Sequence, residues 1–416
     1  MTKTRQIGFL ACLMAAFFFA FELIQLHMMN VLSSDVMHEL KLNAAAWGTL
    51  TSSYLFADVL FLIPAGIILD RLSVRRVILA SVVLCIIGIF GFANAFNLVS
   101  ASFFHFISGI GNAFCFLSCM TLATKWFEPK RRGFIMALMI TVGMLGAALA
   151  QWPVSLLMQT FTWRSLLLLD GALGFFLLIG VYLFVHEPLT PASSPIITWK
   201  GSFRLFTKAL RNPQNMLSGL YISLMNMPLM LLGAVWGNLF LKQIFHFSDQ
   251  DAAMIIGMIA TGTIFGSTFF GWLSERLAEK RFPMRVGAFT SFFLLIAIFL
   301  MPQESKVLFA VLYFLLGFFT SSQVLGYPVI TENSPQDYPA TSLGVGGVLV
   351  MGLPMLLYPF TGFLLDLSWD QLLVDGVRLF SLQNFLVAFS IMPIGIFLSF
   401  FLTHFIREQK AVIENP

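Results

Sequence analysis

The chain has 416 residues, of which 58% are hydrophobic and only 11% are charged, and its formal net charge is +4. A soluble domain carries roughly 25% charged residues, so this composition excludes an ordinary water-soluble protein and requires lipid around most of the surface. The four cysteines lie in apolar stretches without metal-ligand spacing, and there a thiol behaves as a small hydrophobic group. We therefore expect no metal and no cofactor. The cations lie between the apolar stretches, which argues against a nucleic-acid partner.

Twelve apolar stretches are long enough to cross a membrane, for which a helix needs roughly 20 residues. They run over 7–31, 47–69, 77–96, 100–124, 133–158, 164–185, 216–240, 252–273, 285–302, 306–329, 342–367 and 382–406. The first stretch is too long for a signal peptide and lacks a small-residue cleavage site, so we expect a retained helix. The pattern predicts an all-α membrane protein.

The positions of the cations predict the orientation of these spans. With both termini in the cytoplasm, 19 of the 24 lysines and arginines fall on the cytoplasmic face, as the positive-inside rule requires. A missed span would invert this alternation partway along the chain. Short loops and the lack of targeting signals favour the inner (plasma) membrane of a bacterium.

The longest connection between spans runs over 186–215. It begins with a Pro- and Ser-rich stretch and becomes basic and partly amphipathic from Lys200 to Arg211. We expect a cytoplasmic linker with a short interfacial helix. The predicted division is therefore an N-terminal six-helix bundle over 1–185, a linker over 186–215 and a C-terminal six-helix bundle over 216–416.

A short motif recurs in the two halves, between spans two and three and between spans eight and nine. A glycine, three residues, an acid and an arginine occur first at Gly66, Asp70 and Arg71, and again 205 residues later. The second set is Gly271, Glu275 and Arg276. Both lie at the predicted cytoplasmic end of a helix, which indicates an internal repeat.

The first motif resembles the signature loop of the major facilitator superfamily (MFS), G-x-x-x-D-R-x-G-R-R. Gly66, Asp70, Arg71 and Arg75 match, whereas Ser73 and Val74 depart from the pattern, and Arg76 can supply the charge lost at Val74. The resemblance covers the whole chain. It implies two pseudo-symmetric six-helix bundles around a central cavity that opens alternately to either side.

These loop residues have two interpretations. Asp70 and Arg71 can latch the cytoplasmic ends of the bundles, because a carboxylate accepts hydrogen bonds from a helix N-terminus and pairs with arginine. Alternatively, the arginines, Arg75 and Arg76 among them, only mark topology.

Three acids, Glu22, Asp58 and Asp170, stand inside apolar spans, where a charge costs roughly 2.5–3.5 kcal/mol near the helix centre. Many facilitators carry an arginine in span four that communicates with an acid on the first helix; here His105 occupies that position. We hypothesise that Glu22 and His105, together with Asp58, form a proton-coupling group, since histidine titrates near neutral pH. The alternative is that Glu22 contacts substrate and His105 is a packing residue. Asp170 is expected to pair with Arg164.

Other polar residues within the spans are candidates for contact with a substrate. The alternative for each is a polar group satisfied between packed helices. The candidates are Gln25, Asn30, Tyr54, Asn112, Tyr221, Asn226, Gln323 and Tyr327.

The favoured function is proton-driven uptake of a small nutrient such as an amino acid, a short peptide or a nucleoside. The stretches Phe21 to Gln25 and Tyr54 to Asp58 look similar to transporters that supply amino acids to intracellular bacteria, and distantly to lysosomal dipeptide carriers. Proton-coupled export of drugs or metabolites is the alternative, although span five lacks the Gly-Pro pair of drug antiporters. No nucleophile–base spacing or nucleotide loop is present, so we expect no enzyme. We expect a monomer whose partners are its small-molecule substrate, protons and lipid.

Overall fold

A computed structural model describes residues 3–187, 201, 207–208, 210–301, 305–333, 339–374 and 377–407. Within these residues, twelve helical segments are long and apolar enough to cross a membrane. They coincide with the twelve predicted spans, and the all-α fold class is confirmed. The interfacial helix predicted within 186–215 lies largely outside the described residues.

The first six spans are built from seven helices. These are α1 (Lys3–Glu39), α2 (Ala44–Arg71), α3 (Val74–Ala93), α4 (Leu98–Trp126), α5 (Pro129–Leu149), α6 (Trp152–Leu157) and α7 (Trp163–Phe184). An N-cap residue stands directly before α2, α3, α4 and α7, and its side chain accepts a hydrogen bond from a backbone N–H of the first turn. These residues are Asn43, Ser73, Asn97 and Thr162. Short polar side chains are favoured at this position because the first N–H groups of a helix have no partner within it.

The last six spans contain more interruptions. Their elements are α9 (Pro213–Pro228), the π-helix η1 (Leu229–Trp236), α10 (Gly237–Phe245), α11 (Asp249–Leu277), α12 (Arg281–Leu300), α13 (Lys306–Thr320), the 3₁₀-helix η2 (Ser321–Leu325), α14 (Gly326–Glu332), α15 (Pro339–Leu367), α16 (Leu382–Phe389) and α17 (Ile391–Phe405). Two antiparallel two-residue strands, β1 (Leu373–Val374) and β2 (Val377–Arg378), form a hairpin after α15.

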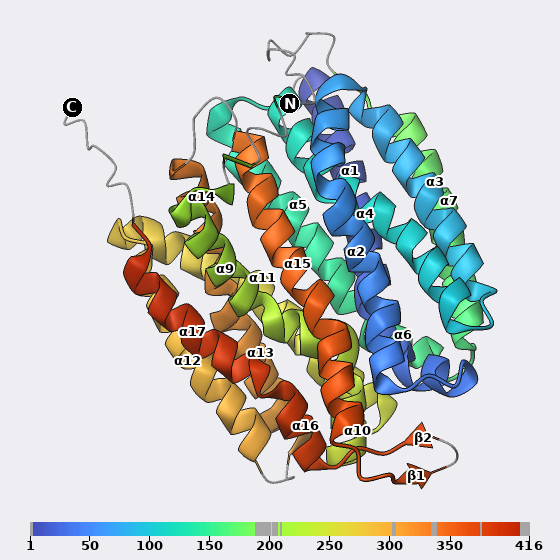
Figure 1. Ribbon diagram of the computed structural model, residues 1–416. Helices are drawn as coiled ribbons and strands as arrows, with labels where there is room; N and C mark the ends of the chain where they lie inside the picture. Colours follow the sequence, from blue (N-terminus) through green and yellow to red (C-terminus); the bar gives the residue numbers. More distant parts are fainter. Residues whose placement is uncertain are drawn as a thin grey trace.

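The two sets of six spans form two bundles that stand side by side (Figure 1). The start of α1 and the end of α17 lie on one side of the molecule, here called the terminal side. The hairpin, α6, α10 and α16 lie on the other side, here called the far side (Figure 1). Helix α2 of the first bundle packs along α15 of the second.

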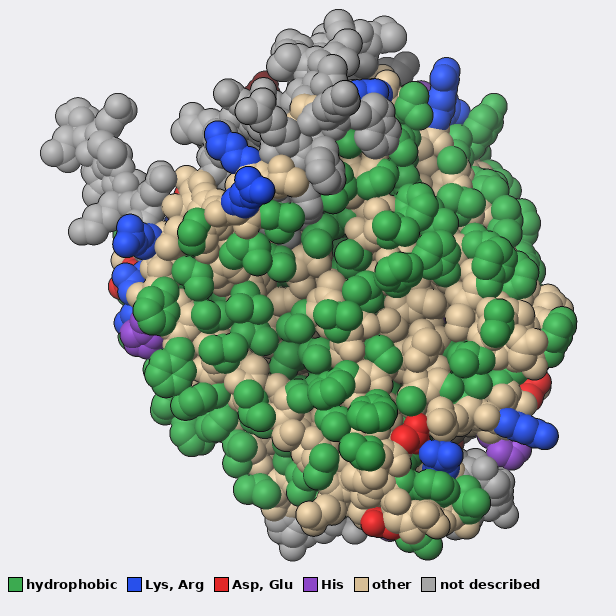
Figure 2. All heavy atoms as spheres, viewed as in Figure 1, with side chains coloured by type: hydrophobic (Ala, Val, Ile, Leu, Met, Phe, Trp, Pro, Cys, Tyr) green, Lys and Arg blue, Asp and Glu red, His purple; other side chains and the backbone are tan. Residues whose placement is uncertain are grey.

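Large apolar side chains are exposed over the outer surface. Phe56, Phe103, Phe176, Ile179 and Phe293, for example, are each at least half exposed. Hydrophobic side chains cover the middle of the face seen in Figure 2, and lysines and arginines gather toward its margins. In water such a surface would be strongly unfavourable, whereas in a bilayer it contacts lipid. The protein is therefore an integral, multi-pass membrane protein.

Several spans differ from their predicted form, among them span ten, which η2 interrupts, and span twelve, which breaks between α16 and α17. Helix α1 extends to Glu39, eight residues beyond the predicted end at residue 31. Span five breaks at Gln151 between α5 and α6, where Pro153 cannot donate the backbone hydrogen bond that a continuous helix needs. Span seven changes to a π-helix directly after Pro228. Hydropathy gives no signal for any of these features.

Candidate functional site

Glu22 is fully buried within the first bundle, where two neutral side chains hold its carboxyl group. The hydroxyl of Tyr54 on α2 donates to Oε2 at 2.5 Å, and the thiol of Cys85 on α3 donates to Oε1 at 2.6 Å. No lysine or arginine is buried in the part of the chain that the structure describes. Glu22 therefore has hydrogen-bond partners but no basic counter-ion among the contacts of its carboxyl group.

Two glycines of α4 bring these partners within reach. A methyl group at Gly109 would lie 2.2 Å from the backbone oxygen of Tyr54, and one at Gly111 would lie 2.1 Å from Sγ of Cys85. Any larger residue would push α2 or α3 away from α4. Gly109 and Gly111 therefore allow close packing of α4 against α2 and α3.

His105 is next to this group but not bonded to Glu22. Its buried ring lies 5.0 Å from the ring of Tyr54 and 5.3 Å from that of Phe92, between centroids. Its Nε2 atom has no hydrogen-bond partner. Tyr54 therefore connects the two predicted residues, because its ring packs on His105 and its hydroxyl bonds Glu22.

The other two acids of the apolar spans belong to the same region. Asp58 on α2 is buried and hydrogen-bonded by the side chain of Asn112, and its charge interacts with that of Glu22. The charge of Asp170 on α7 also interacts with that of Glu22. The structure thus brings Glu22, Asp58 and His105 together with Tyr54 and Asn112.

The predicted pairing of Asp170 with Arg164 is wrong. Both carboxyl oxygens of Asp170 are buried without a hydrogen-bond partner. Arg164 instead pairs with Glu39 at 2.8 Å and donates to the backbone oxygen of Ala93. The physical reason is the longer α1, whose last residue, Glu39, reaches the start of α7, where Trp163 also donates to it at 2.6 Å.

The remaining substrate-contact candidates fall into two groups. Asn30 and Tyr221 use their polar atoms in contacts between helices: Tyr221 bonds Ser322 at 2.9 Å and the backbone oxygen of Met284 at 3.1 Å. Gln323 donates to Asn226 at 3.2 Å, and Nε2 of the buried Gln25 has no partner. Tyr327 is half-buried. Gln25, Asn226, Gln323 and Tyr327 therefore remain candidates for substrate contact.

The predicted gating residues lie at helix ends on the terminal side of the molecule. Ser73, which replaces a glycine of the signature, is the N-cap of α3, and this explains the departure from the pattern. The guanidinium of Arg75 donates to the backbone oxygen of Tyr182 on α7 and lies over its ring. Arg75 thus contacts its own bundle. Asp70 and Arg71 end α2, but the side chain of Asp70 lies outside the described part of the chain.

The equivalent residues of the second bundle have similar positions. Arg276 lies over the ring of Trp272, 5.2 Å from its centroid. A methyl group built at Gly66, Gly133 or Gly271 meets no described atom within 4 Å. On the terminal side, the ends of α2, α5 and α11 are therefore not closely packed against described residues at these glycines.

On the far side, by contrast, the bundles are tightly joined. A methyl group at Gly48 on α2 would lie 2.3 Å from the backbone oxygen of Tyr358 on α15, and one at Gly362 would lie 2.2 Å from that of Ala44. The hydroxyl of Ser52 donates to the backbone oxygen of Met355 at 2.6 Å. These contacts close the far half of the α2–α15 interface.

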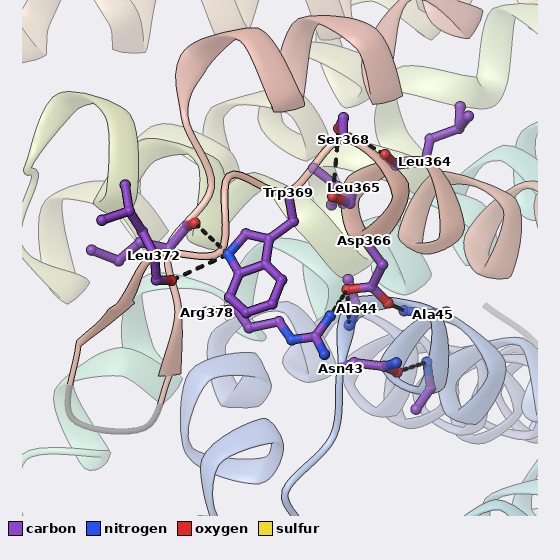
Figure 3. Close-up of polar contacts among 12 residues, drawn as sticks. Asn43, Ala44, Ala45, Leu364, Leu365, Asp366, Ser368, Trp369, Leu372 and Arg378 are labelled. Atoms are coloured by element: carbon purple, nitrogen blue, oxygen red, sulfur yellow. Dashed lines mark hydrogen bonds and ion pairs between the residues drawn. The ribbon is translucent and has the colours of Figure 1, made fainter.

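A charged group, not predicted from the sequence, completes this closure (Figure 3). Asp366 at the end of α15 accepts hydrogen bonds from the backbone N–H groups of Ala44 and Ala45, at 3.2 and 2.8 Å, and pairs with Arg378 at 2.8 Å. Arg378 lies over the ring of Trp369. The second bundle thus caps a helix of the first. Such a contact cannot be predicted from the sequence, because acids are common at the ends of membrane spans.

Two pseudo-equivalent bundles, a lipid-facing surface and a buried acid cluster in one bundle define a multi-pass membrane transporter. The sequence model of the family described as Major Facilitator Superfamily matches residues 8–359 of this chain, and the chain belongs to this family. It is a secondary transporter of small organic solutes, and members of this family are not enzymes.

Individual relatives are distant. The probable galactarate/D-glucarate transporter GarP of Escherichia coli (strain K12) is 23% identical over 357 residues, which cover 77% of this chain and 80% of GarP. A bacterial homolog of the human lysosomal transporter Spinster, inward-facing and unoccupied, has a TM-score of 0.76 at 18% identity and covers 99% of this chain and 100% of its own. The nucleoside transporter NupG, in a mutant form, has a TM-score of 0.75 at 15% identity, over 97% of this chain and 100% of NupG.

Proposed function

We propose that this protein imports a small neutral or zwitterionic nutrient, such as an amino acid or a short peptide, together with protons. The observation that carries this proposal is the environment of Glu22, which is buried and hydrogen-bonded by Tyr54 and Cys85. A buried carboxyl group without a fixed basic partner can take up and release a proton without leaving an unpaired cation. Such a group is suited to coupling proton binding to a conformational cycle.

The same environment supports the choice of substrate class. Galactarate and D-glucarate carry two carboxylates, and dianions are generally bound by lysine or arginine. The buried residues that the structure describes include neither. Hydrogen-bonding groups such as Gln25, Asn226 and Gln323 suit a neutral or zwitterionic solute better than a dianion.

The proposed direction rests on the orientation of the chain. We propose that the terminal side faces the cytoplasm, since 19 of the 24 cations fall on that side in the twelve-span topology. The side closed by Asp366 and Ser52 then faces outward. In this arrangement the protein has the inward-facing form of the transport cycle.

Transport into proteoliposomes with an imposed inward proton gradient tests the proposal. Amino acids, dipeptides, nucleosides, galactarate and lipophilic cations are first screened by thermal shift, and those that stabilise the protein are then offered as substrates. We expect accumulation of a neutral or zwitterionic solute, lost in Glu22→Gln, while counterflow exchange continues. Accumulation that survives Glu22→Gln would exclude Glu22 as the coupling acid. Stabilisation by lipophilic cations alone would favour export.

A further inference from the structure

The seventh span contains an unusual segment at its contact with the first bundle. The eight residues of η1, Leu229–Trp236, form a π-helix and are all buried. In this geometry a backbone N–H bonds a carbonyl five residues back, as Gly237 does with Leu232. A methyl group at Gly237 would lie 2.2 Å from the oxygen of Leu232, so the glycine permits this conformation.

Two amide side chains of the first bundle bind carbonyls of this segment. Nδ2 of Asn30 on α1 donates to the backbone oxygens of Leu232, at 2.7 Å, and Gly233, at 3.0 Å. Nε2 of Gln151 donates to the same oxygen of Gly233, at 2.8 Å, and to that of His27, at 3.0 Å. Gln151 reaches this position because span five breaks at that residue.

A third amide closes the network. The backbone N–H of Asn238, just beyond η1, donates to Oδ1 of Asn30 at 3.0 Å, and Nδ2 of Asn238 donates to Oε1 of Gln151 at 3.3 Å. All three side chains are at least nine-tenths buried. Water does not compete for these bonds, so their loss leaves buried polar groups unpaired.

The carbonyls of η1 have a second possible set of partners. In an α-helix the oxygen of Gly233 would accept from the N–H of the residue four positions on, which is Gly237. The carbonyl of Gly233 can therefore be satisfied either by Asn30 and Gln151 or by the backbone of its own segment. Separation of the bundles at this point breaks the first set and allows the second.

The position of Asn30 connects this network to the acid cluster. Asn30 and Glu22 lie on the same helix, eight residues apart, and at 1.5 Å per residue this is about 12 Å along α1. A movement of α1 that follows a change at Glu22 reaches Asn30 directly, because a helix moves as a rigid element.

We propose that Asn30, Gln151 and Asn238 form a gate that holds the far side closed: Asn30 and Gln151 bind carbonyls of η1 in its π-helical form, and Asn238 bonds both of these side chains. Opening of the far side then returns η1 to α-helical hydrogen bonding. The gate acts in the transport cycle whichever solute is carried and whether or not protons drive it.

Spin-label distances across the far side test the gate. Labels are attached at His38→Cys, at the end of α1, and His246→Cys, at the end of α10; both positions are exposed, whereas Cys12, Cys85, Cys115 and Cys119 are buried. The full-length protein is measured in lipid by double electron–electron resonance. Asn30→Ala and Gln151→Ala are compared with Ser33→Ala, which removes a hydroxyl that donates to the backbone oxygen of Asn30 within its own helix.

We expect a longer-distance population in Asn30→Ala and Gln151→Ala, with at least about a tenfold rise in the ratio of open to closed forms, because each variant loses three hydrogen bonds. Ser33→Ala should match the parent. Distance distributions that stay unchanged in both amide variants would overturn the gate.

Gly237→Ala tests the π-helix separately, because it leaves all three amide side chains in place. The added methyl group favours the α-helical form, so this variant should also show the longer distance. A distribution like that of the parent would overturn the role of η1. Monodisperse elution of each variant establishes that a changed distribution does not come from unfolding.

Discussion

Asp366, near the end of α15, and Arg378, in strand β2, form an ion pair of 2.8 Å at the junction of the two bundles. The same carboxylate accepts hydrogen bonds from the first N–H groups of α2, at Ala44 and Ala45. The N-terminus of a helix carries a partial positive charge. Asp366 therefore holds two positive groups at once, one from each bundle.

We expect Asp366→Asn to weaken the junction, because the amide keeps the hydrogen-bonding shape but loses the charge. A charge at a helix N-terminus contributes about 0.3–1 kcal/mol, and the partly buried pairing with Arg378 adds to it. The melting temperature in detergent should fall by a few degrees. Asp370→Asn, which changes an exposed acid beyond the same helix end, should leave it unchanged. Equal melting temperatures for both variants would contradict the capping role.

The fold could be predicted from the sequence because hydropathy and charge report directly on the membrane. Each predicted span overlaps a helix, and the repeat at Gly66 and Gly271 indicated two related halves. The exceptions were local. The extension of α1 to Glu39, the break at Gln151 and the π-helix after Pro228 depend on individual prolines and on contacts between particular side chains, and an apolar stretch has the same hydropathy in either form.

The acid cluster was predicted in part. A carboxyl group in an apolar span is conspicuous, so Glu22 and Asp58 could be named together with His105, whereas Tyr54 and Asn112 were predicted only as candidates for contact with a substrate. Cys85 could not be predicted as a partner of Glu22, because a cysteine in an apolar span usually only packs. The rotation of each helix about its axis decides these contacts, and one sequence does not fix it.

Close packing of α2 against α4 can be tested at a glycine. We expect Gly109→Ala to destabilise the protein, because its methyl group would lie 2.2 Å from the backbone oxygen of Tyr54. Overpacking of this kind costs typically about 1–3 kcal/mol. Gly133→Ala on α5, where a methyl group meets no described atom within 4 Å, should be neutral or slightly stabilising. Thermal unfolding of the two variants compares them. If Gly109→Ala is as stable as Gly133→Ala, this contact does not limit the packing.

Tyr54→Phe tests the hydrogen bond to Glu22 without changing the ring. The substitution removes the 2.5 Å bond to Oε2 but keeps the contact with His105. A hydrogen bond to a charged group contributes about 1.5–3 kcal/mol, so we expect at least about a tenfold lower rate of proton-driven uptake. Tyr313→Phe, which removes a buried hydroxyl without a hydrogen-bond partner, is the matched control. Similar rates for the two variants would exclude the bond from the transport cycle.

Glu187, beyond the end of α7, predicts a pH dependence of stability. Burial raises the pKa of Glu187, but hydrogen bonds from Lys125, Ser73 and the backbone N–H of Arg75 lower it by more than burial raises it. The pKa therefore lies below the ordinary value of 4.5. A lowered pKa means that the carboxylate stabilises the fold above pH 4.5, and that this stabilisation is lost as the pH falls through the folded-state pKa. Glu187→Gln should therefore melt earlier than the parent at pH 7, and the difference should shrink below pH 4.5. A constant difference across this range would contradict the assignment.

His105 offers the sharpest distinction between a packing residue and a member of the proton-coupling group. Its ring packs between Tyr54 and Phe92, and phenylalanine has nearly the same shape, so His105→Phe preserves the packing. If packing were its whole role, the variant would fold and transport like the parent.

We expect His105→Phe to keep a melting temperature close to that of the parent but to lose proton-driven accumulation while counterflow exchange continues. The reason is that Nε2 of His105 is buried without a partner beside the tyrosine that bonds Glu22. A buried polar atom without a partner destabilises the fold, so its presence calls for a function. His404→Phe, at an exposed histidine near the end of α17, controls for the loss of a histidine elsewhere. Accumulation at the parental level in His105→Phe would show that the ring only packs, and would leave Glu22 and Asp58 as the titrating groups of the cluster.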